Sequence, residues 1–234
     1  MGDFNINWED RSARQKLKQI TDKNNAELLQ ELTEYEPQNE EVKHLRVLVY
    51  GPVGAGKSSL INSIATALMG RMAIPAAANN TQADEGSFTV QFNPKSSISP
   101  SDALYNPNPK PDDKAHVLVL LLSANCPGTD PSVIQKMKEV REAARDLGIP
   151  QIAIGTHIDE MCEEIEKDLT NVYKSESLKK KMEIFSSEVG ITVNCIMAVK
   201  NYSEEMKNNP DMDTLILTAL KYMVDFGDDF IEEM

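Results

Sequence analysis

Short apolar runs alternate with amphipathic segments along most of the 234-residue chain. The run at 117–122 is continuously apolar and has the length of a strand, which is typical of strands buried on both faces of a parallel sheet. Between such runs, apolar residues recur at the spacing of one helix face. The pattern predicts strands at 45–50, 88–92, 117–122, 151–155 and 191–198, and helices at 57–69, 131–147, 160–189 (with a break near 174–175) and 213–230.

Strands that alternate with helices imply an α/β fold with a doubly wound, mainly parallel sheet between two helical layers, a three-layer sandwich. Residues 1–43 are expected to form an N-terminal helical arm, and residues 44–234 the α/β domain. Prolines punctuate residues 94–114, which predicts a long surface loop. The arm either packs on the domain or mediates self-association.

The first predicted strand leads into Gly-Pro-Val-Gly-Ala-Gly-Lys-Ser-Ser at residues 51–59, which matches the phosphate-binding pattern G-x-x-x-x-G-K-[ST]. Glycines let several backbone N–H groups approach one phosphate chain, and the following helix adds its dipole. A glycine-rich turn that carries a lysine by chance is the alternative, and the flanking strand and helix favour the phosphate site. The phosphate-binding candidates are Gly51, Gly54, Ala55, Gly56, Lys57, Ser58 and Ser59, with Lys57 on the β- and γ-phosphates and the Ser58 hydroxyl on Mg²⁺.

A second motif, Thr156-His157-Ile158-Asp159, directly follows a predicted buried strand and resembles the [NT]-K-x-D motif of GTPases. One carboxylate can accept both adjacent donors of guanine, N1–H and the N2 amine, whereas adenine would present a lone pair to it. Asp159 therefore favours guanine, and the two motifs together indicate that residues 44–234 form a P-loop, G-domain-like unit. His157 replaces the usual lysine and could stack on the purine. The alternative is an acidic helix start, since acidic residues suit the positive end of a helix dipole.

Taken together, these segments resemble the interferon-induced protein 44 and 44-like family of vertebrates. The resemblance rests on His44 to Ser63, Asp146 to Pro150, Asn171 to Ser175, Val193 to Ile196 and Val199 to Tyr202. It implies a cytoplasmic, interferon-inducible, GTP-binding protein of the antiviral immune response, with GTP or GDP and Mg²⁺ as ligands. Val199 and Lys200 fall where GTPases place a backbone amide against guanine O6, and Thr81 falls where a nucleotide switch would hold Mg²⁺.

One departure bears on hydrolysis. The Asp-x-x-Gly motif, whose aspartate holds the Mg²⁺ shell in GTPases, occurs nowhere in the sequence, which indicates an internal deletion of several tens of residues. No residue can be assigned to orient the attacking water. The expectation is a GTP binder with slow or absent turnover. The alternative is a nucleotide-stabilised or empty scaffold that acts through protein partners, and an ATP-using enzyme is disfavoured by Asp159.

Composition narrows the class of partner. The net charge of −13 argues against binding to a nucleic-acid backbone, which needs clustered Lys and Arg. No apolar run approaches the length of a membrane span, and the first residues lack the pattern of a secretory signal. Three cysteines without C-x-x-C spacing are expected to be free thiols in a reducing compartment. A guanine nucleotide and a protein partner, or a second copy of the chain, are the expected ligands.

Overall fold

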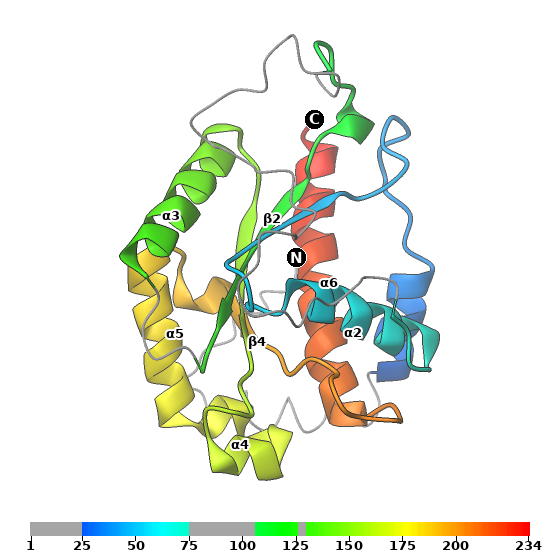
Figure 1. The fold of residues 1–234 in the computed structure, drawn as a ribbon. Coiled ribbons are helices and arrows are strands. Elements are labelled where there is room, and N and C mark those ends of the chain that lie inside the picture. Colours follow the sequence, from blue (N-terminus) through cyan, green and yellow to red (C-terminus); the bar gives the residue numbers. More distant parts are fainter. Residues whose placement is uncertain (1–24, 75–105, 126–129) are drawn as a thin grey trace.

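Four parallel strands form one sheet in the computed structural model of the chain, which describes residues 25–74, 106–125 and 130–234 (Figure 1). They lie in chain order across the sheet: β1 (Val47–Tyr50), β2 (Val117–Ser123), β3 (Gln151–Thr156) and β4 (Ile196–Ala198). The prediction of the last strand was too long, because Val193–Cys195 form a 3-10 turn before β4. The strand predicted at 88–92 lies outside the described residues.

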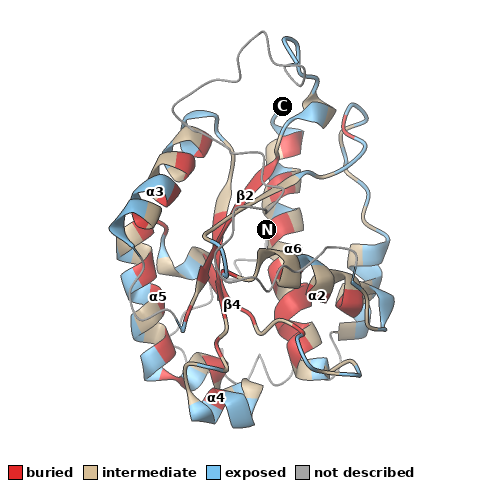
Figure 2. Cartoon of the chain, viewed as in Figure 1, coloured by how far each residue is buried: buried red, intermediate tan, exposed pale blue. Residues whose placement is uncertain are grey.

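β2 is the centre of the sheet, and its side chains build two separate cores. Leu118, Leu120 and Leu122 belong to the core on one face, whereas Val117, Val119 and Leu121 belong to the core on the other. Residues 117–121 have no exposed surface at all, as the red centre of Figure 2 illustrates. Successive side chains of a strand point to opposite faces, so a continuously apolar strand requires cover on both.

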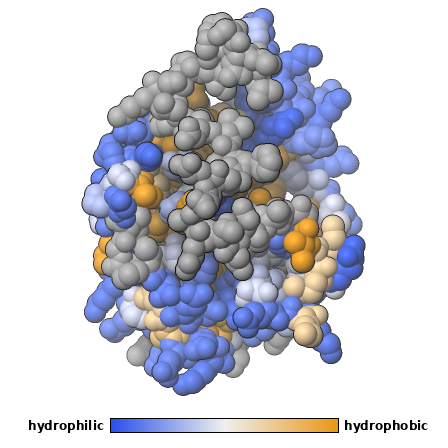
Figure 3. Space-filling model, in the orientation of Figure 1, coloured by the Kyte–Doolittle hydropathy of each residue, from blue (hydrophilic) through white to orange (hydrophobic). Residues whose placement is uncertain are grey.

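Helices provide that cover. α3 (Pro131–Asp146) and α5 (Glu176–Val189) pack on one face, and α2 (Lys57–Met69) and α6 (Pro210–Glu232) on the other (Figure 1). The predicted three-layer α/β fold with a parallel sheet is therefore confirmed. None of the helices among the described residues is both long and apolar enough to cross a membrane. The described residues that Figure 3 colours on this face are mostly hydrophilic, in keeping with the charge of the chain.

Helix boundaries follow local capping. The segment predicted at 160–189 divides into α4 (Glu163–Lys167), the 3-10 turn Leu169–Lys174 and α5, because the Ser175 hydroxyl accepts the Leu178 N–H and starts a new helix. α6 begins at residue 210, three residues before the prediction, because the Asn209 side chain accepts the N–H groups of Asp211 and Met212.

The described part of the N-terminal arm packs on α6. Residues 25–33 are helical, and Leu28, Leu29 and Leu32 contact the core beneath α2 and α6. The Tyr35 hydroxyl donates to Asp228 at 2.8 Å, and burial together with this bond raises the pKa of Tyr35. Of the two predicted roles for the arm, packing on the domain is the one seen here. The division of the chain at residues 43 and 44 stays a prediction.

A buried histidine fixes the start of β1 against β2. His116 is fully buried, and its Nδ1 must accept the hydrogen bond of 3.0 Å from the Arg46 N–H, because a backbone amide can only donate. The other ring nitrogen, Nε2, therefore carries the proton and donates to Pro111 O at 3.0 Å. Pro111–Asp113 form a single 3-10 turn within the stretch predicted as a loop.

We predict that His116→Leu lowers the free energy of unfolding by about 1–3 kcal/mol, because it removes the hydrogen-bond partner that the buried ring gives to the Arg46 N–H and the Pro111 carbonyl. Chemical denaturation measures this loss. The control is His44→Leu at an exposed position of the same segment, which should change stability by less than about 0.5 kcal/mol. Equal effects of the two substitutions would contradict the structural role of His116.

Candidate nucleotide-binding site

The phosphate-loop candidates connect β1 to α2 at the carboxyl edge of the sheet. Gly51 lies so close to β2 that a Cβ there would collide with the carbonyl oxygen of Leu121. Gly56 has φ of +83° and immediately precedes α2, whose first turn is capped by no side chain. The N–H groups of that turn are therefore available to an external acceptor such as a phosphate.

Lys57 bridges the two ends of the loop. Its Nζ donates to the carbonyl oxygens of Gly51 and Pro52, both at 2.8 Å. The side chain is half-buried, and this burial lowers the pKa of Lys57 from its ordinary value of 10.5. Ala55 is buried, Gly54 is exposed with φ of +80°, and Ser58 and Ser59 lie half-buried in the first turn of α2.

The base-recognition candidates begin at the end of β3 and are joined directly to this loop. Thr156 is fully buried, and its hydroxyl donates to Ala55 O at 2.9 Å. Since the hydroxyl has one proton, the contact of 2.9 Å between Thr156 Oγ1 and His157 Nδ1 requires the imidazole to donate. The two loops, about a hundred residues apart in sequence, thus share one chain of hydrogen bonds.

His157 adopts an unusual backbone conformation. Its φ is +54°, and it is the only non-glycine residue with positive φ in the described part of the chain. Such a conformation costs on the order of 1–3 kcal/mol and tends to occur at functional sites. The ring lies against the phosphate loop: a Cβ added at Gly56 would be 3.5 Å from His157 Cε1. The histidine therefore reaches the loop despite being shorter than lysine.

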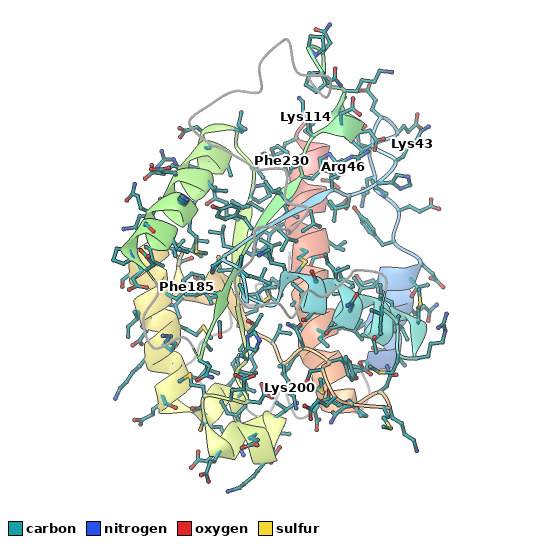
Figure 4. The ribbon with its side chains drawn as sticks, in the orientation of Figure 1. Lys43, Arg46, Lys114, Phe185, Lys200 and Phe230 are labelled. Atoms are coloured by element: carbon teal, nitrogen blue, oxygen red, sulfur yellow. The ribbon has the colours of Figure 1, made fainter. Side chains whose placement is uncertain are left out.

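Asp159 and Lys200 face each other from the loops after β3 and β4. Lys200 Nζ lies 3.4 Å from Asp159 Oδ2 and 3.1 Å from Glu205 Oε1. Figure 4 shows Lys200 at the end of the molecule opposite to Lys43, Arg46 and Lys114. Burial lowers the pKa of Lys200, but the hydrogen bonds and charges of Glu205 and Asp159 outweigh it and raise the pKa. Two carboxylates and one ammonium thus share this corner of the site.

The loop after β4 contributes one contact and one residue that sequence reasoning missed. Asn201, which lies in a segment that carries the family resemblance, places its Nδ2 3.4 Å from Gly56 O, whereas its Oδ1 is buried without a hydrogen-bond partner. Glu205 is the missed residue, and no motif or periodicity marks its position. Val199 is buried, and its N–H donates to Gly155 O at 2.9 Å, so a base carbonyl would have to share this donor with the sheet.

Metal ligands are sparse. Ser58 lies at the position expected of a Mg²⁺ ligand, and Thr81 falls outside the described residues. Within residues 25–74, 106–125 and 130–234, no three His, Cys, Asp or Glu side chains gather as a metal site would require.

The geometry defines an α/β protein in which the candidate phosphate loop is joined by a hydrogen bond to the loop after β3. The chain is similar to interferon-induced protein 44 of Homo sapiens (28% identity) and of Mus musculus (26%), and to human interferon-induced protein 44-like (23%), in each case over 88% of its length. The predicted resemblance is therefore confirmed. The chain spans 57% of the human relatives and 60% of the mouse one. No protein-family model matches it.

The alignment with human interferon-induced protein 44 bears on the predicted deletion. It extends over 255 residues, whereas 88% of 234 residues is about 206, so about 49 aligned positions lack a residue of this chain. The internal deletion stays a prediction.

Two crystal structures of Toc33 from Arabidopsis thaliana also match over 92% of both chains. One is a dimerization-deficient mutant (12% identity, TM-score 0.46), and the other is in complex with GDP and Mg²⁺ (14%, 0.47). Likeness at this level carries no information on a ligand of this chain.

Two glycine substitutions separate backbone strain from contact across the site. Gly54→Ala, with φ of +80° and open space around it, should cost about 1–2 kcal/mol of stability. Gly56→Ala has the same strain, and its Cβ would lie 2.9 Å from Asn201 Nδ2, so the Asn201 amide must move and we expect up to about 1 kcal/mol more. Urea unfolding compares them, and equal losses would argue against tight packing of the two loops.

Proposed function

We propose that this protein binds guanine nucleotides at the phosphate loop and the loops after β3 and β4, as a GTPase-like protein with weak or absent hydrolysis. The observation that carries the proposal is the hydrogen bond of 2.9 Å from the Thr156 hydroxyl to Ala55 O. It links the candidate phosphate site to the candidate base site, so that one nucleotide could contact both Lys57 and Asp159.

The surroundings of the Lys57 ammonium support phosphate binding. Its ammonium is half-buried and bonded to two neutral carbonyls, which compensate the charge only in part. A triphosphate would replace these carbonyls with anionic oxygens and provide a stronger, charge-assisted bond. The N–H groups at the start of α2 would bind the same phosphates, and Ser58 would add its hydroxyl to the shell of a Mg²⁺ ion.

The base end is supported by Asp159 and His157. The Asp159 carboxylate is one-fifth exposed and can accept N1–H and the N2 amine of guanine together. The imidazole of His157, held by Thr156, offers a flat surface beside the loop on which a purine could stack. The backbone amides near Val199 and Lys200 are the proposed donors to guanine O6.

Hydrolysis is proposed to be weak because the sequence lacks the Asp-x-x-Gly motif and offers no residue to orient water. The similarity to interferon-induced protein 44 supports a role in the interferon-induced antiviral response, and we propose a cytoplasmic location on the same basis. These are properties of the whole relatives, and we assign them to this chain by analogy.

A second candidate function is a nucleotide-independent scaffold that acts by protein–protein interaction or self-association. One observation favours it: the charged groups of the site already have partners within the chain, Lys57 on loop carbonyls and Asp159 on Lys200. Such internal pairing would let the fold persist without a bound nucleotide.

Equilibrium binding of GTP, GDP and ATP, with and without Mg²⁺, separates the two functions. We expect guanine nucleotides to bind better than ATP, and Lys57→Ala to weaken all of them by at least about tenfold, because a charge-assisted bond is lost. Asp159→Ala should weaken GTP and GDP by a similar factor and leave ATP unchanged. The controls are Lys180→Ala on α5 and Asp229→Ala on α6, which remove exposed charges away from these loops. Absence of binding at physiological nucleotide concentrations would favour the scaffold.

Binding should also depend on pH through Lys57. A phosphate favours the charged lysine, so affinity is complete below the lowered pKa of Lys57 and is lost as the pH rises through it, below 10.5. Titrating GTP affinity from neutral pH to about pH 10 tests this. Lys57→Ala is the control, because guanine ionises alike with both proteins. Parallel curves would show that Lys57 does not meet the phosphates.

A further inference from the structure

We propose that Glu205 is a positioning residue that sets guanine selectivity by holding the Lys200 ammonium away from the base-reading carboxylate of Asp159. This inference rests on the proposed function, since it concerns the same base site. It goes beyond the proposed function because it assigns a role to Glu205, which belongs to no nucleotide-binding motif. Glu205 acts only through Lys200.

The Lys200 ammonium lies closer to one of its two neighbouring carboxylates than to the other. Lys200 lies 3.1 Å from Glu205 and 3.4 Å from Asp159, and the three side chains are only 20–22% exposed. A bond between an ammonium and a carboxylate is normally about 2.7–2.9 Å long, so both contacts are longer than the optimum and the one with Asp159 departs from it further. Glu205 is therefore the principal partner of the lysine, and Asp159 keeps most of its capacity to accept hydrogen bonds.

Glu205 is itself held in place. Its Oε2 accepts the backbone N–H of Ser203 at 2.9 Å and that of Glu204 at 3.2 Å, while Oε1 faces Lys200. Burial raises the pKa of Glu205, but these hydrogen bonds and the nearby lysine outweigh it and lower the pKa, so the group is ionised at neutral pH. A carboxylate that accepts hydrogen bonds from three groups has a fixed position, and it therefore also fixes the ammonium that it binds.

The loop that carries Lys200 and Glu205 is braced against the rest of the fold. The Tyr202 N–H donates to Ser63 Oγ on α2 at 2.9 Å, and the Tyr202 hydroxyl donates to Asp213 on α6 at 2.8 Å. Tyr202 is only 6% exposed. Because both helices fix the middle of the loop, the position of Glu205 relative to Lys200 is set by the fold.

The chemistry of purines turns this arrangement into selectivity. Guanine offers Asp159 two donors, whereas xanthine has a carbonyl at C2 that would meet the carboxylate with a lone pair. Without the Glu205 charge, Asp159 becomes the only carboxylate bonded to Lys200, and the pair tightens. The ammonium would then compete with the guanine donors and offer the xanthine carbonyl a partner.

The test measures dissociation constants of GTP and XTP for the wild-type chain and for Glu205→Gln. We expect Glu205→Gln to lower the preference for GTP over XTP by about tenfold, a size typical of one charge-assisted hydrogen bond. Glu204→Gln removes the same charge one residue away, at an exposed position, and should leave the preference unchanged. Glu205→Asp should restore part of it.

Repeating the comparison in a chain without the Lys200 ammonium tests whether Glu205 acts through Lys200. In the Lys200→Met chain, Glu205→Gln should no longer alter the preference, because the ammonium through which Glu205 acts is gone. An effect that persists there, or equal results for Glu205→Gln and Glu204→Gln in a chain that binds GTP, would overturn the inference and leave the proposed function standing. A wild-type chain that binds neither GTP nor XTP would overturn both.

Discussion

The hydrogen bond from the Thr156 hydroxyl to Ala55 O is the contact on which the geometry of the site depends. It is fully buried on the threonine side, and it joins the end of β3 to the loop after β1 across the intervening strand β2. A buried hydroxyl without a partner costs on the order of 1–3 kcal/mol, so the bond also fixes the loops energetically. Gly56 is small because Thr156, His157 and Asn201 all converge on it.

The sequence predicted the sheet well because its signals are local. A fully apolar strand such as β2, and a helix start such as Asp130 followed by Pro131, are decided by neighbouring residues. The phosphate loop could be predicted for the same reason. The contacts of Lys200 with Glu205 and of Asn201 with Gly56 could not, because they depend on how a loop of no regular pattern folds back on the sheet.

The site combines an unfavourable backbone conformation with charged side chains that have partners within the chain. The positive φ of His157 and the desolvation of Lys57 are unfavourable by themselves, and the surrounding hydrogen bonds keep them in place. Proteins commonly trade stability for such arrangements where ligands bind. Helices on both faces supply the necessary stability, since β2 buries its side chains completely on each side.

The location of α2 has a consequence for chain topology. It packs on the face of α6, opposite to α3 and α5, although β2, β3 and β4 all follow β1 in the same direction across the sheet. Connections between parallel strands are almost always right-handed. A right-handed crossover from β1 to β2 would place its helix on the face of α3 and α5. Because α2 lies on the opposite face, β1, α2 and β2 do not form a simple right-handed strand–helix–strand unit.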